Sequence, residues 1–290
     1  MEPRAIASAP TRAPVEFLLR LGDNALILSQ RLSEWTGHGP ELEEDIALTN
    51  IALDLLGQAR MLLNHAGAGM QPPREEDALA FWRDANEFRN VTALELPNSG
   101  VHAARGAAGD YAFTILRQTL FSAYMLVLWP MLAESDDEVL AGIAMKAIKE
   151  TRYHWRHASD WTQRLGDGTE LSNQRMQAAL DQYFPYTNEW FMFDAIDAVV
   201  LRHSLKTLDQ LPDAATEDAE TLQHEAASLA LMLRENWLGF IDPLLRRANL
   251  RKPAPSQLQT RGRFGVHGEH LSILLNDMQS VARAHPGVSW

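Results

Sequence analysis

The sequence predicts an all-α protein, built as a bundle of long antiparallel helices with additional helices packed around it. Three observations lead to this prediction. Apolar residues recur at three- and four-residue steps along most of the chain, which is the period of one helix face. No strand-length segment alternates apolar and polar residues between hairpin turns. Four of the expected helices are long and joined by short connections, which is typical of an antiparallel bundle.

The first two long helices are expected over residues 17–35 and 41–66. The first has its apolar residues on one face, and Gly37, Gly39 and Pro40 follow it as helix-ending residues. The second opens with carboxylates, which suit a helix N-terminus, and is apolar on most of its circumference. We therefore expect the second helix to occupy a central place in the bundle.

The other two long helices are expected over residues 110–133 and 137–165. The first contains the longest uncharged stretch, residues 118–133, which is shorter than the roughly 20 residues that cross a bilayer and includes Pro130. A buried core helix, kinked near this proline, is therefore expected. Shorter helices are expected over residues 77–88, 172–184, 188–206, 216–238 and 269–283, with a loop at 95–100.

Composition restricts the kinds of partner. The 290 residues include 38 acidic and 26 basic side chains, a net charge of −12, which disfavours nucleic acid or an anionic membrane as the main partner. The absence of cysteine excludes disulfides, thiolate nucleophiles and iron–sulfur clusters in this chain. Residues 1–14 lack the apolar segment of a signal peptide and are expected to form a flexible tail. We expect residues 15–290 to form one cytoplasmic domain.

The stretch AIKETRYHWRH, residues 147–157, raises the question of a metal site, because it contains Glu150, His154 and His157. Helical bundles can hold two iron ions through a Glu-x-x-His pair on each of two helices and one Glu on each of the other two. Residues three apart stand on the same side of adjacent turns and converge on one ion. In this chain Tyr153 occupies the third position after Glu150, and the histidine comes one residue late, turned by about 100°.

The other ligand positions are also incomplete. In the helix expected over 41–66, Asp54 is followed three residues later by Gly57 where a histidine ligand would belong. The helix expected over 110–133 has no carboxylate between Asp110 and Glu134. The sequence thus predicts no metal site, with Asp54, Glu150 and His154 as degenerate ligand positions.

Two metal-binding alternatives stay open. Glu150 and His154 are four residues apart, a spacing that can chelate a single ion, and His267 and His270 could supply further nitrogen. The simpler interpretations are a buried hydrogen-bonded pair between His154 and Glu150, and a capping role for the two later histidines at a helix start.

Two further segments are of interest. The aromatic run YFPYTNEWFMF, residues 183–193, suits either an interface or the core, with Trp190 and Phe191 as the residues to test. Residues 243–268 carry six basic side chains and no acidic one. We favour a helix C-terminus followed by a solvated loop, with an acidic partner or the phosphates of coenzyme A (CoA) as the alternative.

Three long stretches and the C-terminus carry a resemblance to a known family. They are LRLGDNALILSQRLSEWTGHGPELEEDIALTNIALDLLGQAR, AIKETRYHWRHASDWTQRLGDGTELSNQRMQ, GVHGEHLSILLNDMQ and the closing PGVSW. The chain resembles the C subunits of bacterial phenylacetyl-CoA ring-1,2-epoxidases, which are multicomponent di-iron monooxygenases of aerobic phenylacetate breakdown. Residues 1–14 and 209–220 lie outside the resemblance. Family members mostly have HTEH where this chain has HGEH, so Gly268 weakens any role for that loop.

The resemblance implies a ferritin-like fold and a non-catalytic role. C subunits are related to the catalytic A subunit, have lost its metal ligands, and pair with it as structural partners. No catalytic residue and no cofactor is therefore expected in this chain. Di-iron is expected in the A subunit, with other epoxidase subunits and a flavin and iron–sulfur reductase as further partners. The rival interpretations are an autonomous di-iron oxygenase and a helical protein that binds a CoA thioester. If the bundle holds no iron, Asp54, Glu150, His154 or Lys146 could form a compensated polar network at its centre.

Overall fold

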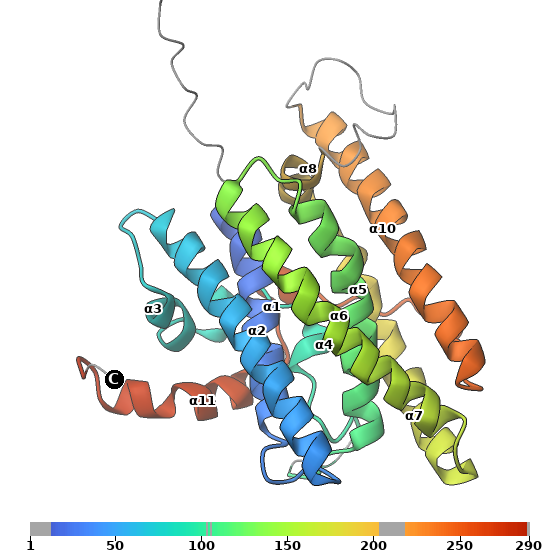
Figure 1. The fold of residues 1–290 in the computed structure, drawn as a ribbon. Helices are drawn as coiled ribbons and strands as arrows, with labels where there is room; N and C mark the ends of the chain where they lie inside the picture. Colours follow the sequence, from blue (N-terminus) through green and yellow to red (C-terminus); the bar gives the residue numbers. More distant parts are fainter. Residues whose placement is uncertain (1–12, 103, 105, 203–217, 289–290) are drawn as a thin grey trace, which may run out of the picture.

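The computed structural model describes residues 13–102, 104, 106–202 and 218–288. The regular secondary structure of this part is helical, apart from one isolated bridge between Arg261 and Val266 (Figure 1). The four long helices expected for the bundle are α1 (Val15–Ser33), α2 (Leu42–Ala68), α5 (Tyr111–Leu132) and α6 (Glu138–Gly166). A fifth, α10 (Ala219–Arg247), has 29 residues and is as long as α6. The other helices in the described residues are α3 (Glu76–Phe81), α4 (Thr92–Glu95), α7 (Glu170–Tyr183), α8 (Ala195–Leu201) and α11 (Glu269–Ala284), with 3-10 turns η1 (Ala85–Glu87), η2 (Phe184–Phe191) and η3 (Gly262–Phe264). The all-α prediction is confirmed.

The long helices pack as two antiparallel pairs, α1 with α2 and α5 with α6. In Figure 1, α2 and α6 lie side by side at the front, while α10 covers one flank against α5 and α8. Buried apolar side chains between Ala13 and Leu275 form one hydrophobic cluster. Two helices, α2 and α5, are long and apolar enough to span a membrane by composition alone. The most apolar window of α5 is 78% buried within the chain, as the core-helix prediction requires.

Several helix boundaries differ from those expected. No single helix runs through residues 188–202, because η2 ends at Phe191 and the Asp194 side chain accepts hydrogen bonds from the Ile196 and Asp197 amides, which starts α8 afresh. Residues 203–206 of the expected helix lie outside the described part. In α10, by contrast, the helix continues past residue 238 and through Pro243. Its last turns bury Ile241, Leu244 and Leu245, so the apolar stripe extends farther than expected. Of the expected N-terminal tail, residues 1–12 lie outside the described part.

Candidate functional site at the seam between α2 and α6

Polar side chains cross between α2 and α6 at three places, which we call the polar seam. Its members are Glu44, Asp54 and Gln58 of α2, and Glu150, His154 and His157 of α6. Residue numbers along α2 rise as those of their partners on α6 fall, because the two helices run antiparallel. All three degenerate ligand positions predicted from the sequence therefore come together in one row.

Each seam residue has a partner on the facing helix. The His157 Nε2 atom lies 2.8 Å from Glu44 Oε2, and the His154 Nε2 atom lies 3.0 Å from Asp54 Oδ2. The Gln58 amide donates to Glu150 Oε2 at 2.9 Å. Since buried polar groups are costly unless they are hydrogen-bonded, these pairs stabilise the contact between the two helices.

Two neighbouring side chains extend the polar seam. Lys146, one turn before Glu150, lies 3.3 Å from its carboxylate. The Tyr111 hydroxyl at the start of α5 donates to Glu44. Burial and the nearby carboxylate raise the pKa of this hydroxyl well above its usual value, so it stays protonated as a donor. Glu44 thus links three helices.

The start of α6 is fixed by Asp137. Its side chain caps the helix by accepting hydrogen bonds from the Val139 and Leu140 amides at 3.1 Å. The same carboxylate accepts from the Ala13 amide at 2.8 Å and lies 2.7 Å from His65 Nε2 near the end of α2. Burial opposes ionisation of Asp137, but these hydrogen bonds outweigh it and lower its pKa. Asp137 therefore sets the position of α6 against α2.

The residues present do not fit a di-iron centre. Three positions after Glu150, the Tyr153 ring stacks on the His157 ring at 6.3 Å rather than offering a ligand. Buried polar residues on α5 are uncharged amides and hydroxyls apart from Arg117. The carboxylate of Asp23 on α1 is buried against Arg83, away from the polar seam. In the described part of the chain, no three His, Asp or Glu side chains gather in a way that could hold a metal ion.

Two details of the expected polar network are different in the structure. His154 pairs with Asp54 across the helix boundary, not with Glu150 on its own helix. The network also lies along the α2–α6 boundary rather than at the bundle centre, since Asp54 and Lys146 reach solvent. Helical periodicity places residues on a face, but it does not give the register between two helices.

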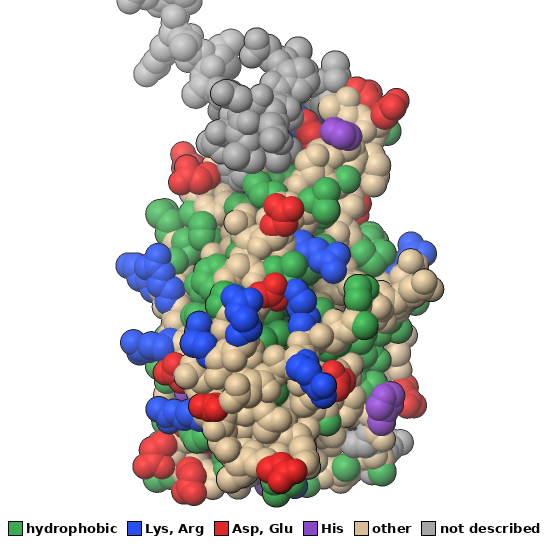
Figure 2. Space-filling view, turned by 90° about the vertical axis from the view of Figure 1, so that its right-hand side faces the viewer, with side chains coloured by type: hydrophobic (Ala, Val, Ile, Leu, Met, Phe, Trp, Pro, Cys, Tyr) green, Lys and Arg blue, Asp and Glu red, His purple; other side chains and the backbone are tan. Residues whose placement is uncertain are grey.

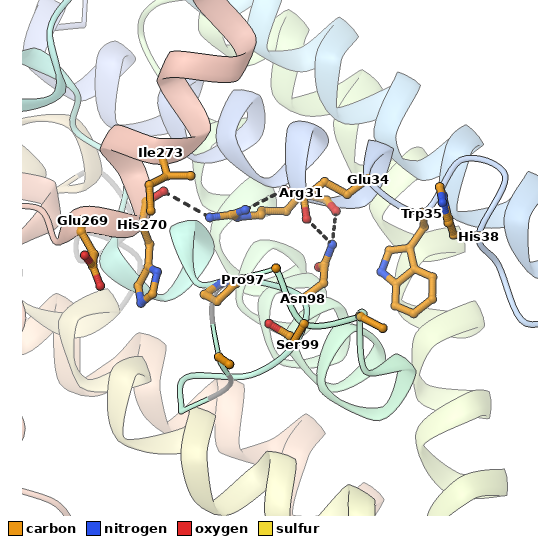
Figure 3. Close-up of a pocket in the computed structure, with 15 residues that line it drawn as sticks. Arg31, Glu34, Trp35, His38, Pro97, Asn98, Ser99, Glu269, His270 and Ile273 are labelled. Atoms are coloured by element: carbon orange, nitrogen blue, oxygen red, sulfur yellow. Dashed lines mark hydrogen bonds and ion pairs between the residues drawn. The ribbon is translucent and has the colours of Figure 1, made fainter.

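A cavity of about 540 Å³ lies beside the bundle, between the end of α1, the loop at 97–109 and the start of α11 (Figure 3). At its wall the Arg31 side chain extends between Glu34 and His270. The Asn98 amide donates to Glu34 at 2.8 Å and to the Arg31 carbonyl at 2.6 Å. Behind it, Arg117 is fully buried and donates to the Leu96 carbonyl at 2.8 Å, and burial lowers its pKa to about 10.

This cavity is poorly suited to the phosphates of CoA. The guanidinium of Arg31 already donates to the Glu95 and His270 carbonyls and pairs with Glu34 at 2.6 Å. Glu34 and Glu269 add negative charge to the lining. Phosphate recognition needs free cationic donors, so the described lining favours a neutral or cationic occupant.

The expected capping role of His267 and His270 is wrong. Gly268 precedes α11, and no side chain caps the helix. His267 instead lies buried, with Nδ1 at 2.7 Å from Glu95 Oε2 and Nε2 at 3.0 Å from the Phe88 carbonyl. Both ring nitrogens face acceptors, so the imidazole is held as the cation. Burial opposes this charge, but Glu95 and the Phe88 carbonyl outweigh it and raise the pKa of His267.

His267 should make the free energy of unfolding depend on pH. Because the pKa of His267 is raised on folding, the stabilisation it provides is complete below its unfolded pKa of about 6.5 and is lost as the pH rises through its folded pKa. We expect His267→Gln to lower the free energy of unfolding by about 2 kcal/mol at pH 6, the scale of a charge-assisted hydrogen bond, and by less at pH 9. Urea denaturation at both pH values measures this, with the exposed His38→Gln as control. A pH-independent difference would contradict the assignment.

The aromatic run and the basic segment have mainly structural roles. Trp190 is buried against Trp237, with ring centroids 5.9 Å apart, so it belongs to the core rather than to an interface. Arg263 is also buried, and its guanidinium lies 2.6 Å from Asp197, contrary to the expected solvated loop. The remaining cations of the segment are exposed: Arg246, Arg247, Arg251, Lys252 and Arg261. Figure 2 shows Lys and Arg side chains gathered across the middle of the face that α10 covers.

Comparison with known proteins agrees with the expected family. A family model described as phenylacetic acid catabolic protein matches residues 1–290. The C subunit of the 1,2-phenylacetyl-CoA epoxidase of Escherichia coli (strain K12) is 40% identical over 274 residues, which cover 94% of this chain and 98% of that protein. The similarity thus extends over nearly the full length of both chains. The chain therefore belongs to the phenylacetic acid catabolic protein family.

Proposed function

We propose that this chain is a non-catalytic structural subunit of a 1,2-phenylacetyl-CoA epoxidase in aerobic phenylacetate catabolism, and that it pairs with the di-iron catalytic A subunit. The similarity to a C subunit along nearly the whole chain supports the assignment to such a complex. We place the protein in the cytoplasm, with a reductase and other epoxidase subunits as further partners. The chain itself takes no cofactor in this proposal.

The observation that carries the non-catalytic role is the composition of the polar seam. Asp54, Glu150 and His154 are each hydrogen-bonded or ion-paired to a protein side chain, and Gly57 and Tyr153 stand where histidine ligands would be needed. An oxygen-activating centre needs carboxylate and imidazole ligands from four helices. In this proposal the seam residues instead hold α2 and α6 together, and oxygen chemistry belongs to the A subunit.

The rival functions receive less support. An autonomous di-iron oxygenase would require a ligand set that the described helices do not assemble. A CoA-thioester carrier would require free cations for the phosphates, and Arg31 in the large cavity is already engaged by its neighbours. We therefore favour the structural subunit over both.

Co-expression with and without the cognate catalytic A subunit tests the proposal. We expect the isolated chain to contain no stoichiometric iron and to be inactive on phenylacetyl-CoA, and we expect the two chains to co-elute as an iron-containing, reductase-dependent enzyme. Removing the chain should lower turnover and the yield of soluble A subunit. Stoichiometric iron in the isolated chain would favour the oxygenase, and calorimetric binding of phenylacetyl-CoA to it would favour the carrier.

A further inference from the structure

The outward face of α2 carries apolar side chains that nothing in the described chain covers. The most apolar window of this helix is only 50% buried. Four residues on its open face form a single stripe: Leu42, Ile46, Leu53 and Leu56, exposed by 71%, 51%, 60% and 42%. Their spacings of four, seven and three residues keep them on one side of the helix over roughly 21 Å. Contiguous apolar surface of this kind marks an interaction site.

The charges around this stripe are arranged as in a protein interface. No charged residue on α2 is fully exposed between Glu43 at one end and Arg60 at the other. Asp45 lies at the helix start, where it accepts from the Gly37 amide at 2.6 Å, and Asp54 is paired with His154. An uncharged centre with charges at its rim distinguishes the buried core of an interface from ordinary surface.

Gly57 leaves room for close approach by another chain. It lies in the middle of α2, next to Leu56, where glycine is less favourable than alanine because of its backbone entropy. A Cβ atom built at this position meets nothing within 4 Å, so no contact inside the chain explains the missing side chain. Small residues let the backbones of two helices come close together. A helix of another protein that crosses α2 here would explain why glycine occupies this position.

The adjoining face of α6 indicates the charge of that partner. Between residues 142 and 160, the exposed charged residues of α6 are cationic apart from Asp160: Lys146, Lys149, Arg152 and Arg156. Among these, Lys146 pairs with Glu150, and Arg156 lies over the Tyr153 ring at 5.8 Å. In a chain with a net charge of −12, such a row favours acidic side chains on whatever binds next to α2.

We propose that the exposed stripe of α2, together with Gly57 beside its C-terminal end, is the surface on which a helix of the catalytic A subunit docks, with acidic residues of that subunit facing the exposed cations of α6. This inference rests on the proposed function, because it takes its partner from there. The partner helix packs its apolar face on Leu53 and Leu56 and passes closest to α2 at Gly57. The polar seam then lies directly behind the interface.

Matched substitutions test the docking surface in the full-length chain. The dissociation constant for the purified A subunit is measured by calorimetry. We expect the double variant Leu53→Glu/Leu56→Glu to raise it at least tenfold, because two charges would be buried in the interface. Leu231→Glu is the control, since Leu231 is a 63% exposed leucine on α10 outside the proposed surface, and it should leave the constant unchanged.

Glycine variants give a second test that does not depend on disruptive charges. Gly57→Ala and Gly239→Ala should both raise the melting temperature of the isolated chain, since both glycines lie in helices and have open space around them. Gly57→Ala and the larger Gly57→Leu should weaken binding of the A subunit, whereas Gly239→Ala should not. Opposite effects on stability and affinity at Gly57 are the signature of a helix crossing.

The possible results separate this inference from the proposed function. If all α2 variants bound the A subunit as tightly as the wild-type chain does, the proposed docking surface would be wrong, but the structural role would still stand. Failure of the wild-type chain to bind the A subunit would refute the proposed function and this inference with it. A homodimer in sedimentation experiments that dissociates in the Leu53→Glu/Leu56→Glu variant, with A-subunit binding unchanged, would assign the surface to a second copy and overturn the partner named here.

Discussion

Replacing Asp197 with Ala is expected to lower the free energy of unfolding by about 3–5 kcal/mol, because it leaves buried arginines without their carboxylate. Arg263 donates to both Asp197 oxygens, at 2.7 and 2.6 Å, and Arg20 donates to one at 3.2 Å. Arg20 keeps a second partner in Asp194, whose pKa these hydrogen bonds lower to about 2 against the opposing effect of burial. Arg263 has no such replacement among the ion pairs of the described chain. Urea denaturation measures the loss.

A matched control for Asp197 is found at the surface. Asp242 pairs with Lys252 at 2.8 Å, but both side chains are well exposed to solvent. We expect Asp242→Ala to change the free energy of unfolding by less than about 1 kcal/mol, because water screens exposed ion pairs. If Asp197→Ala and Asp242→Ala lowered the free energy of unfolding equally, burial of the ion pairs of Asp197 would not determine how much they stabilise the protein.

Replacing Trp190 with Ala should also be strongly destabilising, by about 3–5 kcal/mol, because it opens a cavity in an aromatic core. The Trp190 ring lies 5.4 Å from Tyr124, 5.9 Å from Phe121 and 5.9 Å from Trp237. The Tyr124 hydroxyl donates to the Trp190 carbonyl at 3.3 Å, which further ties η2 to α5. Thermal and urea denaturation of the purified chain measure this loss.

The exposed Trp82 serves as the control for Trp190, since it is the same residue type but half open to solvent. Trp82→Ala should cost under about 1 kcal/mol. If Trp190→Ala left stability unchanged and abolished binding of the A subunit, Trp190 would be an interface residue, as the aromatic run alone allowed. Because Trp190 is buried, we expect the opposite: Trp190→Ala should lower stability first and foremost.

The sequence was a good guide to the helices, because helix-forming signals are local. Asp137, which the sequence placed at the start of a helix, caps α6, and Gly166 is its last residue. The expected end at residue 238 was wrong, because α10 continues through Pro243 to bury Ile241, Leu244 and Leu245. Tertiary contacts decide where such helices end, and these contacts cannot be inferred from a single sequence.

The sequence singled out Asp54, Glu150, His154 and His157 of the polar seam, but not Glu44 or Gln58 and not the pairing. Asp54, Glu150 and His154 stood out because they lie at or next to the ligand positions of a di-iron bundle. Their true partners depend on how α2 slides and rotates against α6, which helical periodicity does not specify. The pairing of His267 with Glu95 joins residues 172 positions apart and was missed for the same reason. Long-range pairs of this kind become visible only once the fold is known.

The antiparallel pairs between α2 and α6 admit one relative placement of these helices. Sliding either helix by a single residue would displace each side chain by about 1.5 Å along the axis and about 100° around it, and the three contacts would be broken together. In bundles that bind two ions, shared ligation ties facing helices at a fixed spacing. In the described chain, side-chain hydrogen bonds across the polar seam provide such a tie, so the register of α2 against α6 is set by groups that both helices carry themselves.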